Sequence, residues 1–340
     1  MEDWLQAAAS AHFATAGLHA VLVTVAAVEG SVPREPGARM LVDATRQWGT
    51  VGGGHLELRG CETARAMLAS FEARRLERFP LGPSLGQCCG GVVQLAFELL
   101  DAEHAKMLAE RPHEDSWRLV ALDGAPDRAL FDAHGQQIHG DAAPAFTGAQ
   151  GAPNFTHIMR GPDERRWLVD KVEAPHEHLM LFGAGHVGAA IVRALADLPC
   201  RVTWVDERED LFPERVPGNV DIEATDTPEA LAEQAPPGTC FLVMTHSHAL
   251  DQRLADAILK RPSFDQDWFG LIGSQTKRKQ FEHRLRDRGI HHARLDAMVC
   301  PIGVAGIEGK APAVIAVAVA AQLLMVWEAR TATKASTGIL

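Results

Sequence analysis

The chain has 340 residues, of which 46% are hydrophobic and 23% charged, and its formal net charge at pH 7 is −11. This length exceeds the size at which single hydrophobic cores usually stop growing, so we expect two domains. The acidic balance argues against a nucleic-acid partner, which would require a basic face. The first residues, Met1-Glu-Asp-Trp, lack the features of a secretory signal, and six cysteines without a CxxC pattern do not indicate a disulfide framework. We therefore expect a cytoplasmic protein with reduced thiols.

Over the first hundred residues, short regular elements alternate with turn-rich loops. Residue spacing predicts helices over 4–17 and 56–71, and β-branched or apolar runs predict strands over 19–28, 39–42, 75–79 and 92–99. The three loops between them are rich in glycine: Glu29–Gly37, Trp48–His55 and Gly86–Gly91. Residues 1–110 are therefore expected to form an α+β domain.

The pattern weakens between Asp101 and Glu173. A helix over 101–110 and strands over 117–122 and 166–172 are compatible with the sequence, whereas 140–162 is rich in Gly, Pro and Ala and is typical of a loop or linker. We expect residues 111–175 to form a variable connecting segment, and no chemistry is assigned to it.

From His178 onward, strands and helices alternate. Strands are predicted over 179–182, 201–205, 221–224, 239–245, 268–272 and 297–300, with helices between them. This alternation predicts an α/β fold with a Rossmann-like, doubly wound parallel sheet over 176–330, followed by a tail at 331–340. The last helix includes the most apolar stretch, Ala311 to Trp327, which is short for a membrane span and contains Gln322, so we predict a buried packing helix and no membrane partner.

The strongest single motif is Leu179-Met-Leu-Phe-Gly-Ala-Gly-His-Val-Gly188, in which a strand runs into a G-x-G-x-x-G pattern and then a helix. Gly183 would form the turn, Gly185 would let a pyrophosphate approach the backbone beside His186, and Gly188 would bring the helix close to the strand. Asp206 would hold ribose hydroxyls, and Arg208 leaves both NAD and NADP open. The alternative is a structural turn that has lost its ligand.

Polar residues follow two later strands of the same predicted sheet. His246, His248 and Asp251 are candidates for cofactor binding or for sharing a metal; the alternative is a helix N-cap at Ser247 with Asp251 in the first turn. Ser274, with Lys277 and Arg278, could bind a phosphate at a helix start, and a solvated basic helix face is the alternative.

Two glycine-rich loops of the first domain could also bind a ligand. The run Gly52, Gly53, Gly54 and His55 opens a predicted helix and could cradle an anion, with Arg34 and Arg39 nearby; tight turns of a small β-rich domain are the alternative.

The other loop contains Cys88 and Cys89, which are candidates for a reactive thiolate or a soft-metal ligand, one of them acting and the other packing.

The chain lacks a G-x-S-x-G, an H-E-x-x-H and a G-K-[ST] motif, so a binding protein without turnover of its own is favoured over an enzyme.

Seven motifs in this order resemble those of the XdhC/CoxI family, and only about residues 101–173 lie outside the resemblance. The motifs are Gly30–Arg39, Gly49–His55, Gly86–Gly91, Leu181–Gly188, Met244–Asp251, Gly270–Ser274 and Pro301–Gly303. At position 55 this chain carries His where CoxI-type relatives often carry Cys.

The resemblance implies an N-terminal XdhC/CoxI domain, a C-terminal Rossmann domain and a homodimer. It further implies a chaperone for the molybdenum cofactor, molybdopterin. Such a chaperone presents the cofactor to a NifS-like cysteine desulfurase and delivers it to apo-xanthine dehydrogenase. The helix-start glycines would suit the phosphate of the cofactor, and Cys88 or Cys89 would suit molybdenum. Two other functions stay open: an NAD(P)-dependent oxidoreductase with Thr245 to Asp251 at its active site, and a nucleotide-sensing adaptor.

Overall fold

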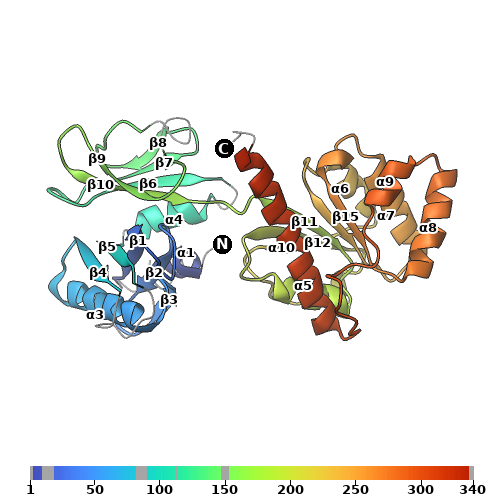
Figure 1. Ribbon diagram of the computed structural model, residues 1–340, viewed down its shortest axis with the longest axis horizontal. Coiled ribbons are helices and arrows are strands. Elements are labelled where there is room, and N and C mark those ends of the chain that lie inside the picture. Colours follow the sequence, from blue (N-terminus) through green and yellow to red (C-terminus); the bar gives the residue numbers. More distant parts are fainter. Residues whose placement is uncertain are drawn as a thin grey trace. The chain divides into compact units, whose positions relative to one another are not determined.

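The computed structural model describes residues 3–9, 19–81, 90–100, 102–111, 114–146 and 153–336. The chain divides into two compact units, Met1–Ala174 and Pro175–Leu340 (Figure 1).

The first sheet of unit 1 is antiparallel, with the strand order β3-β2-β1-β5-β4. Alternate residues of β1 face opposite sides: Val23 lies in the core under α3, and Leu22 lies in the core with α1 and α4. The elements of this layer are α1 (Asp3–Ala9), β1 (Val21–Glu29), β2 (Arg39–Val42), β3 (Gln47–Gly49), α3 (Gly54–Ser70), β4 (Arg74–Pro80), β5 (Val92–Leu99) and α4 (Ala102–Ala109). The predicted α+β character of this part of the chain is confirmed.

The described residues of 114–146 and 153–172 include a second antiparallel sheet, which lies inside unit 1. Its strand order is β8-β7-β6-β10-β9, and the two strands expected from the sequence are present as β6 and β10. Part of the predicted loop over 140–162 forms β9, a short strand without a buried residue, so its sequence lacks the apolar alternation that marks a strand. The strands are β6 (Ser116–Ala121), β7 (Arg128–Asp132), β8 (Gln137–Gly140), β9 (His157–Arg160) and β10 (Arg166–Val172).

A buried carboxylate joins the two sheets of unit 1. Asp170 of β10 accepts hydrogen bonds from Arg39 Nη2 of β2 at 2.7 Å, from Arg118 Nη1 of β6 at 2.8 Å and from Thr156 Oγ1 at 3.1 Å. Arg118 also pairs with Glu98 of β5. Burial opposes ionisation of Asp170, but the two guanidinium groups and their hydrogen bonds outweigh burial and hold its pKa below the usual range. Arg39 is thus a buried structural residue and does not line an anion cradle.

Replacement of this carboxylate tests the role of the cluster. Asp170→Asn leaves two buried guanidinium groups without their shared anion, so we expect the free energy of unfolding of unit 1 to fall by about 3–5 kcal/mol. The matched control is Asp123→Asn, since Asp123 also forms a forked pair with an arginine, Arg166, but at the surface. The control is expected to cost less than about 1 kcal/mol. Urea unfolding measures both values, and equal losses would contradict the role of the buried cluster.

The same carboxylate makes unit 1 sensitive to acid. The folded pKa of Asp170 is lowered, so its contribution is fully present above its unfolded pKa of about 3.9 and is lost as the pH falls through the folded pKa. Unfolding free energies measured between pH 7 and pH 3 should therefore drop in the acid part of this range in the wild type. The drop should be smaller in Asp170→Asn, and parallel curves for the two proteins would argue against this source of acid sensitivity.

Unit 2 contains the predicted Rossmann-type sheet, and all its strands are parallel. The order is β13-β12-β11-β14-β15, which is the 3-2-1-4-5 order of dinucleotide-binding folds, and a bridge from Gly270 to Val299 adds a sixth position. The strands are β11 (Glu177–Phe182), β12 (Cys200–Asp206), β13 (Val220–Ala224), β14 (Cys240–Val243) and β15 (Trp268–Leu271).

Helices cover both faces of this sheet, as predicted (Figure 1). One face is packed against α6, α7, α8 and α9, and the other against α5 and α10. The central strand β11 is buried on both sides, which explains why its sequence is a continuous apolar run. The helices are α5 (His186–Ala194), α6 (Pro228–Gln234), α7 (His248–Lys260), α8 (Gln275–Asp287), α9 (His292–Ala297) and α10 (Pro312–Ser336), with short 3-10 turns η3 (Glu209–Leu211) and η4 (Phe264–Gln266).

The last helix, α10, is only half-buried, whereas the sequence predicted a buried helix. Val319, Leu323 and Trp327 lie in the core beside α5, but Val317 is 61% and Met325 is 65% exposed. By length and composition, α10 is the one helix among the described residues that could cross a membrane, and 33% of its most apolar window is buried in the structure. A helix packed on one face in this way is also typical of a sheet-covering helix.

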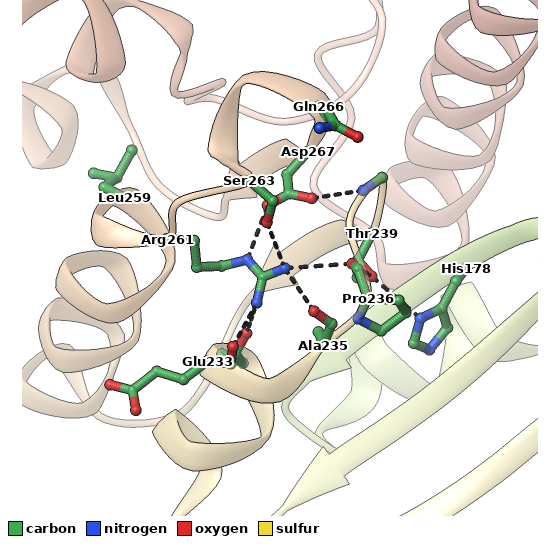
Figure 2. A network of polar contacts seen from close by, with 12 residues as sticks. His178, Glu233, Ala235, Pro236, Thr239, Leu259, Arg261, Ser263, Gln266 and Asp267 are labelled. Atoms are coloured by element: carbon green, nitrogen blue, oxygen red, sulfur yellow. Dashed lines mark hydrogen bonds and ion pairs between the residues drawn. The ribbon is translucent and has the colours of Figure 1, made fainter.

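A buried arginine forms a network of hydrogen bonds at the amino-terminal edge of the same sheet (Figure 2). Arg261, which follows α7, pairs with Asp267 at 2.8 Å and donates to the carbonyl oxygens of Glu233 at 3.0 Å and Ala235 at 2.7 Å. These carbonyls belong to the end of α6, where backbone acceptors have no partner within the helix. Since β14 and β15 begin beside this network, it lies at the edge opposite the ends where ligands of such sheets bind, and its role is structural.

Candidate functional site

The carboxyl-terminal edge of the parallel sheet brings together most of the residues predicted for unit 2. Strand β11 ends at the glycine loop, β12 ends at Asp206, β14 leads to Thr245 and β15 leads to Ser274. The bridge at Val299 brings a further loop, 300–303, to this edge, and its position there was not predicted from the sequence. In sheets of this topology, this edge is where ligands bind.

The three glycines of the fingerprint have the different surroundings that the motif predicts. A Cβ on Gly183, whose φ is +121°, would lie 2.5 Å from Met244 O, and a Cβ on Gly188 would lie 2.1 Å from Gly183 O. A Cβ on Gly185 would meet no atom within 4 Å, so this position faces open space at the start of α5. The helix has no side-chain cap and no acidic residue in its first turn, and His186 is exposed beside it. The loop therefore keeps backbone amides available for an anion.

Alanine at two of these glycines separates folding from binding. Gly188→Ala creates a backbone clash and should lower the free energy of unfolding by about 3 kcal/mol or more. Gly185→Ala should change it by less than about 1 kcal/mol, since the new methyl group meets nothing in the free protein. The same methyl group would occupy the path of a pyrophosphate, so Gly185→Ala should weaken nucleotide binding at least tenfold. Urea unfolding and NADPH titration distinguish the two effects; unchanged nucleotide affinity in Gly185→Ala would remove this loop as the binding site.

Asp206 is held in place at the end of β12 by the protein itself. Its carboxylate accepts the Ala184 amide at 2.7 Å and a fork from Arg208, with Nε and Nη2 each at 2.9 Å. Burial would raise the pKa of Asp206, but the hydrogen bonds from Arg208 and from the two backbone amides at Ala184 and Arg208 outweigh it and lower the pKa. A ribose that approaches Asp206 therefore meets Arg208 first.

A narrow slot lies beside Asp206, between β12, α6 and α7. It has room for about one water molecule, and the His246–Glu207 pair, with Nε2 and Oε1 3.6 Å apart, stands at its rim. The slot was not predicted, because its apolar residues come from four separate elements, β11, β12, α6 and α7. Its lining consists of Phe182, Val205, Asp206, Glu207, Pro228, Thr245, His246, Leu250 and Leu254.

The residues after β14 favour the capping alternative over a shared metal. Ser247 is the N-cap of α7 and accepts the Leu250 amide at 3.3 Å, while Asp251 is buried and accepts Thr245 Oγ1 at 2.7 Å and Lys277 Nζ at 2.7 Å. His248 is exposed at the first position of α7. Across the residues that the structure describes, no group of three His, Cys, Asp or Glu side chains could hold a metal ion.

Ser274 caps α8 and accepts the Lys277 amide at 3.3 Å, and its own side chain is exposed at the carboxyl edge of the sheet. The neighbouring cations are engaged elsewhere, because Lys277 pairs with Asp251 and Arg278 donates to Glu282 Oε1 at 2.6 Å. A phosphate at Ser274 would therefore depend on the helix start and not on these two side chains.

In unit 1, the glycine turn that precedes α3 is partly closed by a carboxylate of the chain. Glu57 accepts the Gly53 amide at 3.1 Å, Gln47 Nε2 at 2.7 Å and the Thr50 hydroxyl. This cap takes one of the amides that an external anion was predicted to use. The amide of Gly53 is thus satisfied from within, while Gly54 and His55 are exposed at the helix start.

The turn-rich loops of unit 1 come together at one end of its first sheet. A Cβ on Gly52, whose φ is +126°, would lie 2.5 Å from Pro33 Cγ and 3.6 Å from Arg34 Cγ, so the loop with Arg34 lies against the glycine turn. The Gly91 amide donates to Ser31 O at 3.1 Å, which fixes the described end of the third loop against the first. Cys88 and Cys89 of that third loop lie outside the described residues.

The fold and the glycine loop together define a two-unit protein whose second unit is a Rossmann-type domain. A family model described as the XdhC and CoxI family matches residues 13–80, and a model described as the XdhC Rossmann domain matches residues 179–323. The chain belongs to the XdhC/CoxI family.

The proteins similar to this chain include two curated relatives and a solved structure. It is 29% identical over 158 residues to the uncharacterized protein YqeB of Escherichia coli, a match that covers 46% of this chain but 28% of that protein. It is 23% identical over 279 residues to a probable xanthine dehydrogenase subunit of Bacillus subtilis, covering 77% and 81% of the two chains. A crystal structure described as a xanthine dehydrogenase from Bacillus halodurans shares the fold, with a TM-score of 0.73, 19% identity and 97% coverage of both chains.

Proposed function

We propose that this protein is a carrier for molybdopterin in the maturation of xanthine dehydrogenase. In this proposal it holds the cofactor while a NifS-like cysteine desulfurase supplies the sulfido ligand, and then delivers it to apo-xanthine dehydrogenase. The observation that carries the proposal is the meeting of the turn-rich loops at one end of unit 1. Membership of the XdhC/CoxI family and the similarity to a probable xanthine dehydrogenase subunit support it.

The chemistry of molybdopterin matches the groups that these loops present. The cofactor has a phosphate, a pterin and a soft, dithiolene-bound metal, and it is the cargo of the proposed reaction. The half-exposed guanidinium of Arg34 and the exposed helix start at Gly54 and His55 suit the phosphate. A thiolate from Cys88 or Cys89 suits molybdenum, because soft ligands prefer soft metals. The buried cysteines are poor candidates, since burial raises the pKa of Cys240 and of Cys200, the latter to about 12.

Purification from a host that makes molybdopterin tests the proposal. The protein should contain molybdenum and, after oxidation, pterin fluorescence. Cys88→Ala or Cys89→Ala should lower the bound molybdenum at least fivefold, while Cys240→Ala serves as the buried matched control and should retain it. Equal retention of molybdenum in all three variants would contradict a thiolate ligand. Absence of both metal and pterin from the wild type would overturn the carrier proposal.

For unit 2 we infer a nucleotide ligand with a 2′-phosphate. The open space at Gly185, at the start of α5, favours a pyrophosphate. Arg208 covers Asp206 and has a third nitrogen, Nη1, that the fork to Asp206 does not use. This arrangement favours NADPH over NADH, and the nucleotide could serve regulation or, as a second candidate function, hydride transfer.

Removal of the guanidinium tests the nucleotide preference. Arg208→Ala exposes the Asp206 carboxylate, so NADH affinity should rise about threefold or more and NADPH affinity should fall about tenfold. Isothermal titration calorimetry measures both, with Arg215→Ala as a control outside the site. Parallel changes for the two nucleotides would contradict the assigned role of Arg208. Oxidation of bound NADPH by a carbonyl substrate would favour the oxidoreductase.

A further inference from the structure

The parallel sheet of unit 2 has one partly covered edge and one open edge. At the β15 edge, Val299 donates to Phe269 O at 2.9 Å and accepts the Leu271 amide at 2.9 Å, so this edge is continued by a further chain segment. At the opposite edge, β13 pairs with β12 and with no other described strand. An edge strand of this kind offers its outward N–H and C=O groups to an additional strand.

The outward backbone groups of β13 belong to Ile222 and Ala224. At one end of the strand, the Asn219 carbonyl accepts a hydrogen bond from β12 at 2.9 Å, and at the other end the Thr225 amide donates to β12 at 3.2 Å. Successive residues of a strand direct their backbone groups to opposite sides, so the odd-numbered residues of β13 face β12 and the even-numbered residues face away from it. No described residue forms a hydrogen bond with the backbone of Ile222 or Ala224.

The two faces of this edge strand differ in chemistry. Ile222 is paired with Trp204 in the register of β12 and β13, and its side chain is 37% exposed on the same face as Ala224. Asp221 and Glu223 lie on the opposite face, both are exposed, and no described residue forms an ion pair with either carboxylate. A neighbouring strand would therefore be matched by apolar side chains on one face and by basic side chains on the other.

The acidic charge of the chain is concentrated around this strand. Residues 206–233 contain ten acidic and two basic residues, in a chain whose net charge is −11. This concentration favours a cationic partner, and it opposes pairing with the same edge of a second copy, which would bring like charges opposite each other. The exposed carboxylates of this segment that have no ion pair with a described residue are those of Glu209, Asp210, Glu214, Asp221, Glu223, Asp226 and Glu233.

We propose that β13 binds an extended segment of a partner protein in which basic and apolar residues alternate. The segment adds a strand to the sheet, and its backbone pairs with Ile222 and Ala224. Its apolar side chains lie beside Ile222, and its basic side chains lie beside Asp221 and Glu223. Charges on an edge strand prevent pairing between identical copies, but they match a strand of opposite charge. The proposal concerns a partner protein and is independent of the ligands proposed for the two units.

Fluorescence polarisation with the full chain and a labelled ten-residue peptide of alternating Lys and Val tests the proposal at 0.15 M salt. Two further peptides have the same side chains but carry N-methyl groups, one on every Val amide and the other on every Lys amide. One set of amides faces β13 and the other faces solvent, so one methylated peptide should bind at least about tenfold more weakly and the other within about threefold of the parent. Equal binding of all three peptides, or an equal loss with both methylated peptides, would overturn the proposal.

Substitutions in the chain test the position of the peptide. Asp221→Asn combined with Glu223→Gln should weaken binding of the parent peptide about tenfold, whereas Glu209→Gln combined with Glu214→Gln removes the same charge outside the strand and should weaken it less than about threefold. Ile222→Pro removes one outward N–H, which an edge strand tolerates, and should weaken binding about tenfold at an unchanged urea midpoint. Equal losses in the two double variants would contradict the proposal. So would a dimer of the free chain that Ile222→Pro dissociates, since it would assign this edge to a second copy.

Discussion

The buried carboxylate of Asp170 is the contact on which the arrangement of unit 1 depends. It receives guanidinium groups from β2 and β6, and so fixes two sheets that also share two apolar clusters. Arg39 is the first residue of β2, directly after the loop that carries Arg34. Gly37 of that loop lies against Thr156, since a Cβ there would be 3.0 Å from Thr156 Oγ1, and Thr156 itself donates to Asp170. The ion cluster therefore also holds one wall of the candidate site.

In unit 2, the polar residues at the two edges of the parallel sheet have different hydrogen-bond partners. At the carboxyl edge, the amides of the glycine loop stay open, which suits a phosphate group, and the ionised carboxylate of Asp206 is paired with Arg208. At the amino edge, Arg261 is saturated by carbonyl oxygens and Asp267, which leaves it no capacity for a ligand (Figure 2). Each unit buries one such pair, Arg39–Asp170 in unit 1 and Arg261–Asp267 in unit 2. The hydrogen-bond partners of both pairs belong to the chain itself, so we assign both pairs a structural role. A buried ion pair therefore indicates a ligand-binding site only where a ligand can replace one of its two members.

The sequence was sufficient for the Rossmann-type sheet because its strands are buried on both faces and its glycines are sterically required. It predicted β5 and β10 with the bounds that the structure has. It did not reveal β7, β8 and β9, which are short and partly exposed, nor α9, a helix of six residues. The sequence also could not show which side chains pair with the candidate site residues. Arg39 and Asp170 are 131 residues apart, and Lys277 reaches Asp251 across two helices, so only the folded chain shows which charges are neutralised.

As proposed above, unit 1 carries molybdopterin as cargo and releases it to a target enzyme. The most direct measurement mixes cofactor-loaded protein with apo-xanthine dehydrogenase, in the presence of a scavenger for free molybdopterin, and follows the molybdenum content of the separated dehydrogenase. We expect transfer of the metal and pterin together, at a rate that the scavenger does not change. Retention of the cofactor by the loaded protein, or transfer that the scavenger abolishes, would contradict it.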